Sequence, residues 1–290
     1  MTNTRSAGQN ARERARAQIT REIKEEARRQ LAAEGAQRLS LRAVARELGM
    51  VSSALYRYFP SRDDLLTALI IDAYDSLGAG AEAAAAARPA DDPRRRWRAC
   101  CQAIRAWAID HPHEYALIYG SPVPGYQAPQ ETIASAARVA VVFGGLLAEA
   151  WPQAASQGAG RPGGLEAGQP AGPRPRQTAG RADGRAADQA DGQVADQADP
   201  ASGPPLPGLL AGQAEALSAA IAPGVPAPVL ARALIAWTQL FGMISFELFG
   251  QLVGTADPSD DFFGYAVDQM ADLIGPPLSP LHDHDRSSAP

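Results

Sequence analysis

The sequence predicts an all-α protein, and two observations support this. Apolar residues recur three or four positions apart along most of the chain, and no long stretch alternates with the period of two that marks a strand. Much of the 46% hydrophobic content is alanine, which favours helices. Charge is also unevenly distributed. Residues 1–62 hold 13 Lys and Arg against 6 Asp and Glu, a net charge of +7. Because the whole chain has a net charge of −5, the remaining residues have a net charge of −12. A basic end on an acidic body indicates a polyanion partner for that end, although a solvated helix face has the same composition.

The first two helices are expected to follow a short tail. Residues 1–10 are polar, which predicts a disordered tail. The next helix is expected over about 11–34, because four apolar residues share one stripe and a glycine follows: Ile19, Ile23, Ala27 and Leu31, then Gly35. A short second helix is expected between the N-cap Ser40 and the terminating Gly49.

A third short helix is expected in "VSSALYRYF", where Val51, Leu55 and Phe59 are spaced by four and should point inward together. Pro60 closes it, and Ser61 is the expected N-cap of a linking helix over 61–78. Two short helices separated by "GM" have helix-turn-helix spacing, so residues 11–60 are predicted to be a three-helix DNA-binding domain.

The remaining residues, 79–275, are expected to form a helical regulatory and dimerisation domain. Helices are predicted over about 93–110, 131–151, 209–221, 228–253 and 258–274, with a short helix in "HPHEYALIYGSPVPGY". Residues 152–205 contain no aromatic residue and only two large aliphatic ones, which predicts a disordered insertion. Residues 276–290 are expected to be a loose tail.

The third helix supplies the side chains expected to contact DNA, because the second helix of a helix-turn-helix lies in the major groove. With Leu55 inward, steps of 100° place Ser53 and Arg57 outward, with Tyr56 beside them. Short hydroxyls let the backbone approach the bases, Arg reads guanine or clamps phosphate, and Tyr commonly bonds phosphate. Further basic residues flank this face as expected phosphate contacts or as a basic arm: Arg42, Arg62, Arg12, Arg14 and Arg16.

With these features, the segment over about 15–75 resembles the DNA-binding domain of the TetR family of transcriptional regulators. A long helix, a short helix ending in glycine, and "LYRYFPSRDDLL" carry the resemblance. It implies DNA contacts at Arg42, Ser52, Ser53, Tyr56, Tyr58 and Arg62. Val51 departs from the family, which usually has a polar residue at this position. Because valine has no side-chain acceptor, the third helix is expected to lack a side-chain N-cap.

The stretch "AWTQLFGMISFELFGQLVG" is similar to the regulatory domain of a TetR subgroup named for a Trp-His-Gly signature, which here reads Trp237, Phe241 and Gly242. The resemblance implies a small-molecule effector and a homodimer formed by the last two long helices, near 228–253 and 258–274. The segment 228–253 is apolar nearly all round, so it needs cover on two sides, from its own core and from a partner. A purely intramolecular core helix is the alternative.

Aromatic residues of the body are candidates for the effector site, since Trp and Tyr bring a donor into an apolar wall. The candidates are Trp107, Tyr115, Tyr119, Trp237 and Phe241. Ordinary core packing is the alternative for each one. No charged cluster lines the predicted inner faces, so an apolar or aromatic effector is expected.

The sequence lacks several motifs typical of enzymes and metal sites. The sequence has no nucleophile elbow, phosphate loop or zinc-protease motif, so an enzyme is not expected. Cys100 and Cys101 are adjacent and cannot share a tetrahedral metal site unaided, and neither a metal nor a cofactor is expected. A cytoplasmic protein without a membrane span is expected. The sequence predicts a sequence-specific DNA-binding regulator, acting as a repressor that an effector releases from a near-palindromic operator; an effector-independent architectural DNA-binding protein is the alternative.

Overall fold

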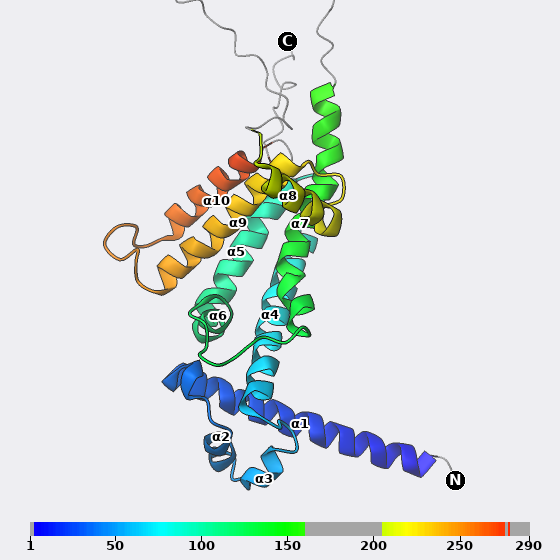
Figure 1. Cartoon of the computed structure of the whole chain (residues 1–290), viewed down its shortest axis with the longest axis vertical. Coiled ribbons are helices and arrows are strands. Elements are labelled where there is room, and N and C mark those ends of the chain that lie inside the picture. Colours follow the sequence, from blue (N-terminus) through cyan, green and yellow to red (C-terminus); the bar gives the residue numbers. More distant parts are fainter. Residues whose placement is uncertain (1–2, 160–204, 276–277, 279–290) are drawn as a thin grey trace, which may run out of the picture.

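The computed structural model describes residues 3–159, 205–275 and 278, and every regular element within those ranges is a helix (Figure 1). This confirms the predicted all-α class. The lower part holds α1 (Asn3–Glu34), η1 (Ala36–Arg38), α2 (Leu41–Glu47) and α3 (Ser52–Leu55). The upper body holds α5 (Pro93–Asp110), α6 (Pro112–Tyr119), α7 (Thr132–Ala159), α8 (Gly208–Ile221), α9 (Ala227–Leu248) and α10 (Asp260–Ile274).

The helix α4 (Arg62–Ala86) joins two separate hydrophobic cores. Its first half, including Leu65 and Leu69, packs with α1, α2 and α3 in the lower core. Its second half, including Leu77 and Ala81, packs with α5 and α7 in the upper core. A single continuous helix therefore connects the predicted DNA-binding domain to the body (Figure 1).

Several caps lie where the sequence predicts them. Ser40 Oγ accepts from the Ala43 N–H of α2, and Ser61 Oγ accepts from the Asp64 N–H of α4. The predicted helix over 93–110 coincides with α5, which begins with a proline after the N-cap Asp92.

Some boundaries differ from those predicted. The predicted tail over 1–10 is wrong from Asn3 onward, because α1 already begins there. Once the folded part of α1 is formed, each added residue gains a hydrogen bond without a new nucleation cost, so the helix can extend into this segment, where only Arg5, Ala7 and Gln9 are good helix formers. The linking helix, predicted over 61–78, continues to Ala86 for a similar reason, since the segment after Leu77 is rich in alanine.

The other boundary differences lie around the predicted insertion and the late helices. The helix α7 continues through Pro152 to Ala159, so residues 152–159 are helical and do not belong to a disordered insertion. The rest of that insertion, up to residue 204, and nearly all of the predicted tail over 276–290 lie outside the described residues. The helix predicted over 228–253 ends at Leu248, before the left-handed Gly250 at φ +76°.

Two helical segments are long and apolar enough to span a membrane by length and composition alone: Thr132–Pro152 and Ala227–Leu248. The inward faces of both belong to the upper core, through side chains such as Leu146 and Leu240. Core helices of folded domains pass the same test, so these two do not indicate a membrane protein.

The two cysteines are buried and free, on the inner face of α5. Burial raises the pKa of the Cys100 thiol to about 11 and that of Cys101 well above its usual range. Both thiols therefore stay protonated near neutral pH and act as small apolar core residues. No group of metal-binding side chains occurs among the described residues.

Candidate nucleic-acid interface

The third helix is held by a tight turn and two buried anchors. Gly49 adopts the left-handed conformation at φ +64°, and the Met50 N–H donates to the Ala45 carbonyl at 2.8 Å, which closes α2 and turns the chain into α3. Leu55 is fully buried and Phe59 is 7% exposed. The α3 helix spans only four residues, but turns continue it, since the Phe59 N–H donates to the Leu55 carbonyl at 3.1 Å.

Five of the seven side chains predicted in and around α3 to contact DNA are exposed at this end of the molecule. Ser52, Ser53, Tyr56 and Arg57 are all exposed on α3 and the turn that follows it. Arg42 is exposed in the first turn of the neighbouring α2. This end of the molecule thus exposes hydroxyls, a phenol and two guanidinium groups, which hydrogen-bond readily to phosphates and base edges.

Val51 contradicts the predicted inward position, because its side chain is 69% exposed. The residue is the N-cap of α3, with extended backbone at φ −69° and ψ 138°. Helical phase begins only at Ser52, so a spacing of four does not bring Val51 onto the Leu55 side. The missing side-chain cap predicted at this position is confirmed.

Tyr58 is half-buried against α1, not freely exposed. The guanidinium carbon of Arg16 lies 5.2 Å from the centre of the Tyr58 ring, in cation–π geometry. Nη2 of Arg16 also donates to the Arg57 carbonyl at 3.3 Å. Arg16 therefore fastens α1 to the end of residues 52–59, which we call the recognition segment because it carries most of the side chains predicted to contact DNA.

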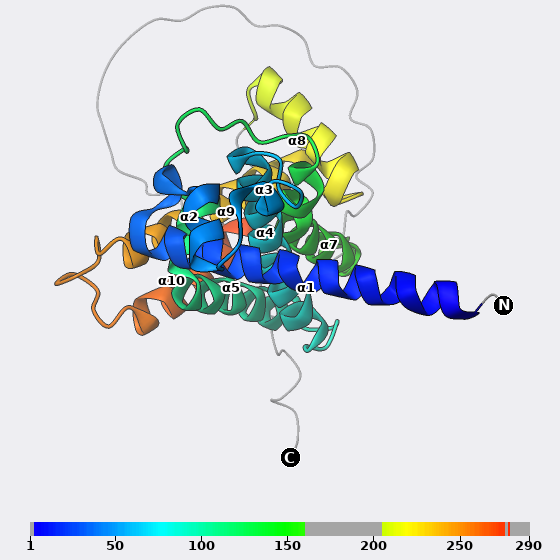
Figure 2. The ribbon, with the colours of Figure 1, turned by 90° about the horizontal axis from the view of Figure 1, so that it is seen from below.

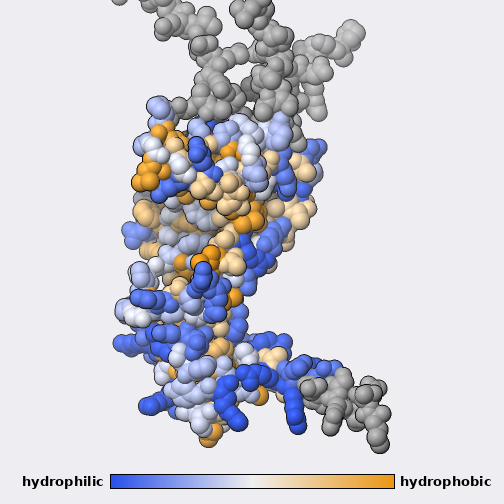
Figure 3. Space-filling model, turned by 45° about the vertical axis from the view of Figure 1, so that its right-hand side comes forward, coloured by the Kyte–Doolittle hydropathy of each residue, from blue (hydrophilic) through white to orange (hydrophobic). Residues whose placement is uncertain are grey.

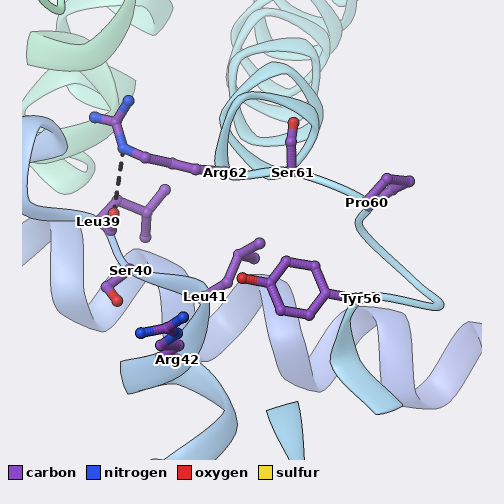
Figure 4. A pocket seen from close by; sticks show the side chains of 8 residues that line it. All are labelled: Leu39, Ser40, Leu41, Arg42, Tyr56, Pro60, Ser61 and Arg62. Atoms are coloured by element: carbon purple, nitrogen blue, oxygen red, sulfur yellow. Dashed lines mark hydrogen bonds between the residues drawn. The ribbon is translucent and has the colours of Figure 1, made fainter. Parts of the chain in front are cut away.

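An open groove of about 430 Å³ lies between the starts of α2 and α4 (Figure 4). Its lining combines two helix N-termini with polar and cationic side chains: Leu39, Ser40, Leu41, Arg42, Tyr56, Pro60, Ser61 and Arg62. The carboxylates of Asp63 and Asp64 offset the positive end of α4. Arg42 and Tyr56 are left as the exposed donors beside the groove, a composition suited to a phosphate.

Arg62 holds the domain together through its guanidinium. Nη2 donates to the Ala36 carbonyl at 2.8 Å. Nε donates to the Leu39 carbonyl at 3.2 Å (Figure 4). Nη1 forms an ion pair with Asp63 at 3.3 Å. These contacts fix the start of α4 against the connection between η1 and α2, a structural role that the sequence did not indicate. Its contact with DNA stays a prediction.

Four of the five predicted effector residues form one aromatic chain between α6 and α9. The ring centres of Tyr119 and Phe241 lie 4.3 Å apart, and those of Phe241 and Trp237 lie 4.7 Å apart. The ring centre of Tyr115 lies 5.2 Å from that of Tyr119. The fully buried Tyr115 donates its hydroxyl to the Phe241 carbonyl at 2.8 Å. Burial raises the pKa of both tyrosines, so both phenols are neutral. Trp107 instead stacks on His111 and donates to Ser76 at 2.9 Å.

The helices α9 and α10 pack side by side and expose large apolar side chains (Figure 1). On α9, Leu234, Ile235 and Phe246 are 46%, 54% and 57% exposed. On α10, Phe262, Tyr265 and Leu273 are 41%, 65% and 42% exposed, at helical spacing. We call these six residues the α9–α10 face. Gly242 is exposed on α9, and a Cβ built there meets nothing within 4 Å, so a second helix has room to approach closely.

Comparison with solved structures places this arrangement among known folds. The chain is similar to the crystal structure of SCO4313, a protein described as regulatory, with 32% identity, a TM-score of 0.60, and coverage of 91% of this chain and 98% of that chain. It also shares its fold with a protein of unknown function from Rhodococcus sp. RHA1, at 19% identity and a TM-score of 0.54.

Comparison of sequences gives the family. Curated relatives include the HTH-type transcriptional regulators Rv1816 of Mycobacterium tuberculosis and Mb1846 of Mycobacterium bovis, each 51% identical over 123 residues, or 42% of this chain. The chain spans about half the length of these relatives, 53%. The family model for bacterial regulatory proteins of the tetR family matches residues 23–69, and that for the tetracyclin repressor-like C-terminal domain matches residues 97–270. The protein therefore belongs to the TetR family of bacterial regulatory proteins.

Proposed function

We propose that the protein is a sequence-specific, homodimeric DNA-binding repressor. The observation that carries this is the exposed set of Ser53, Tyr56 and Arg57 on a segment whose other side is anchored by the buried Leu55. Such a rigid, polar, cationic face at the free end of an acidic body fits a major groove better than any other partner. The protein would act in the cytoplasm, where bacterial DNA lies.

The proposed dimer joins two α9–α10 faces. Large apolar side chains exposed on two adjacent helices are costly to leave in water, and a two-fold symmetric contact covers the same residues on both subunits. Gly242 would let the two α9 helices cross closely, since it adds no side chain to the contact. Two recognition segments would then bind half-sites roughly 34–36 Å apart on a near-palindromic operator.

The effector is proposed to be a small apolar or aromatic molecule that enters the aromatic chain between α6 and α9. Tyr119, Phe241 and Trp237 are in direct ring contact, so a ligand there must part them. Parting them would shift α6, whose Glu114 is paired with Arg28 of α1 at 2.9 Å. Binding would thereby favour an arrangement of the DNA-binding domains with a different half-site spacing, provided that the two arrangements differ in affinity for the effector.

Two substitutions distinguish base reading from backbone contact. Ser53→Ala is expected to change sequence preference, by about 1–3 kcal/mol at one base pair, because a hydroxyl facing base edges is lost. Tyr56→Phe is expected to weaken binding to all sequences alike, because a phenol facing phosphate carries no sequence information. Binding of each variant to a randomised-site library measures both sequence preference and overall affinity. If both variants lost affinity equally for all sequences in the library, the assignment of Ser53 to base reading and Tyr56 to phosphate contact would be contradicted.

A further inference from the structure

The N-terminal half of α1 projects beyond the DNA-binding domain as a helical arm. The helix begins at Asn3, whereas its first fully buried residue is Ile23 (Figure 1). Arg12, Arg14 and Arg16 are all exposed along this arm. Figure 3 shows its described side chains as a hydrophilic projection from the lower end of the molecule.

The contacts of Arg16 show which side of this arm faces the recognition segment. The contacts of this side chain with the Tyr58 ring and the Arg57 carbonyl bring that side of α1 to the end of the recognition segment. Arg12 lies one turn earlier, about 40° around the helix, so it shares the side of Arg16. Arg14 lies about 200° from Arg16 and points away, and its Nε folds back onto the Asn10 carbonyl at 3.1 Å.

The arm also points away from the proposed dimer contact. In two perpendicular views the N-terminal end of α1 lies on the side opposite α9 and α10 (Figures 1 and 2). In a dimer joined through the α9–α10 face, the two arms would therefore diverge outward. From Arg16 to Asn3 the helix rises about 20 Å, which corresponds to roughly six base pairs of DNA.

We propose that this arm binds the phosphate backbone of the DNA flanking the operator, with Arg12 and Arg16 as the contacting cations. The inference rests on the proposed function, since it takes the orientation of the DNA from the recognition segment. A guanidinium needs only a phosphate to bind, so the contact adds affinity and footprint without adding sequence preference.

The test compares Arg12→Gln with Arg14→Gln, two charge losses on the same arm that differ in the side they face. Glutamine has a helix propensity close to that of arginine, so neither change should shorten α1, and circular dichroism checks this. The probe is a site selected from a random duplex library with the full chain, prepared in two lengths: trimmed flush with the site, and extended by ten base pairs on each side.

On the extended duplex, Arg12→Gln should reduce the slope of log affinity against log salt by about 2, one phosphate per subunit. Between 50 and 200 mM salt the wild type should then lose about tenfold more affinity than this variant. On the trimmed duplex the two proteins should differ little, and Arg14→Gln should match the wild type on both.

Equal slopes for Arg12→Gln and the wild type on the extended duplex, with a selected site in hand, would overturn the arm while leaving the proposed function intact. An equal reduction of the salt slope by Arg14→Gln would also overturn the proposed arm contact. It would mean that any positive charge on the arm has this effect, whichever side of the helix it lies on. Failure to select any site would overturn the proposed function and the arm together.

Discussion

Phe246→Glu is expected to give a folded monomer that binds the selected DNA site roughly 10²- to 10⁴-fold more weakly than the wild type. Phe246 is 57% exposed on α9, so the change disturbs little packing within its own chain. In the proposed dimer it lies in the contact, where a desolvated carboxylate against its symmetry copy is strongly unfavourable. Losing the second recognition segment removes the gain of two-site binding.

Sedimentation velocity and DNA titration at one protomer concentration measure this result. The matched control is Ile133→Glu, which places the same charge on a side chain that is 60% exposed on α7. The helix α7 lies on the opposite side of the body from α10 (Figures 1 and 2). The control should stay dimeric and bind normally. A dimeric Phe246→Glu protein with unchanged affinity would refute the proposed contact.

Arg105→Met is expected to cost about 3–5 kcal/mol of unfolding free energy, because it leaves a poorly hydrated carboxylate without its cation. Arg105 on α5 is only 13% exposed and binds Glu247 with two hydrogen bonds of 2.6 and 2.7 Å. It also donates to Asp260 at 2.8 Å and stacks over the Phe263 ring. One guanidinium thus holds the end of α9 and the start of α10, which positions the α9–α10 face.

The matched control on the same helix is Arg95→Met. Arg95 is 77% exposed and pairs with Asp92, so its loss should cost less than about 1 kcal/mol. Chemical denaturation at fixed protomer concentration compares them, since dimer stability depends on concentration. Equal losses in the two variants would contradict the role given to Arg105.

The Arg105 effect should depend on pH in one direction. The hydrogen bonds from Arg105 lower the pKa of Glu247 below its usual range. A lowered folded-state pKa stabilises the protein above the unfolded pKa of about 4.3, and this contribution is lost as the pH falls through the folded value. The difference in stability between wild type and Arg105→Met should therefore shrink below about pH 4.

The sequence predicted the elements that local chemistry determines. Ser40, Gly49, Ser61 and the proline that opens α5 are caps and breakers whose effect is set within a few residues, and each acts where it was expected. The apolar stripes of α1 and α5 follow from helical period alone.

The features that the sequence did not predict depend on contacts between distant residues. The carbonyls bound by Arg62 belong to residues 23 to 26 positions earlier, and Arg16 meets the recognition segment 41 positions later. Val51 was misplaced because a spacing of four was extended to the residue before the start of the helix. The aromatic chain could be predicted as a set of residues, but its assembly depends on α6 packing against α9.

The central proposal, sequence-specific binding by a dimer, is tested most directly by selecting bound DNA from a random duplex library with the full chain at near-physiological salt. A near-palindromic site with half-sites about one helical turn apart is the expected result. Binding that enriches no site and depends only on a steep loss of affinity with salt would contradict it, and would indicate an architectural DNA-binding protein.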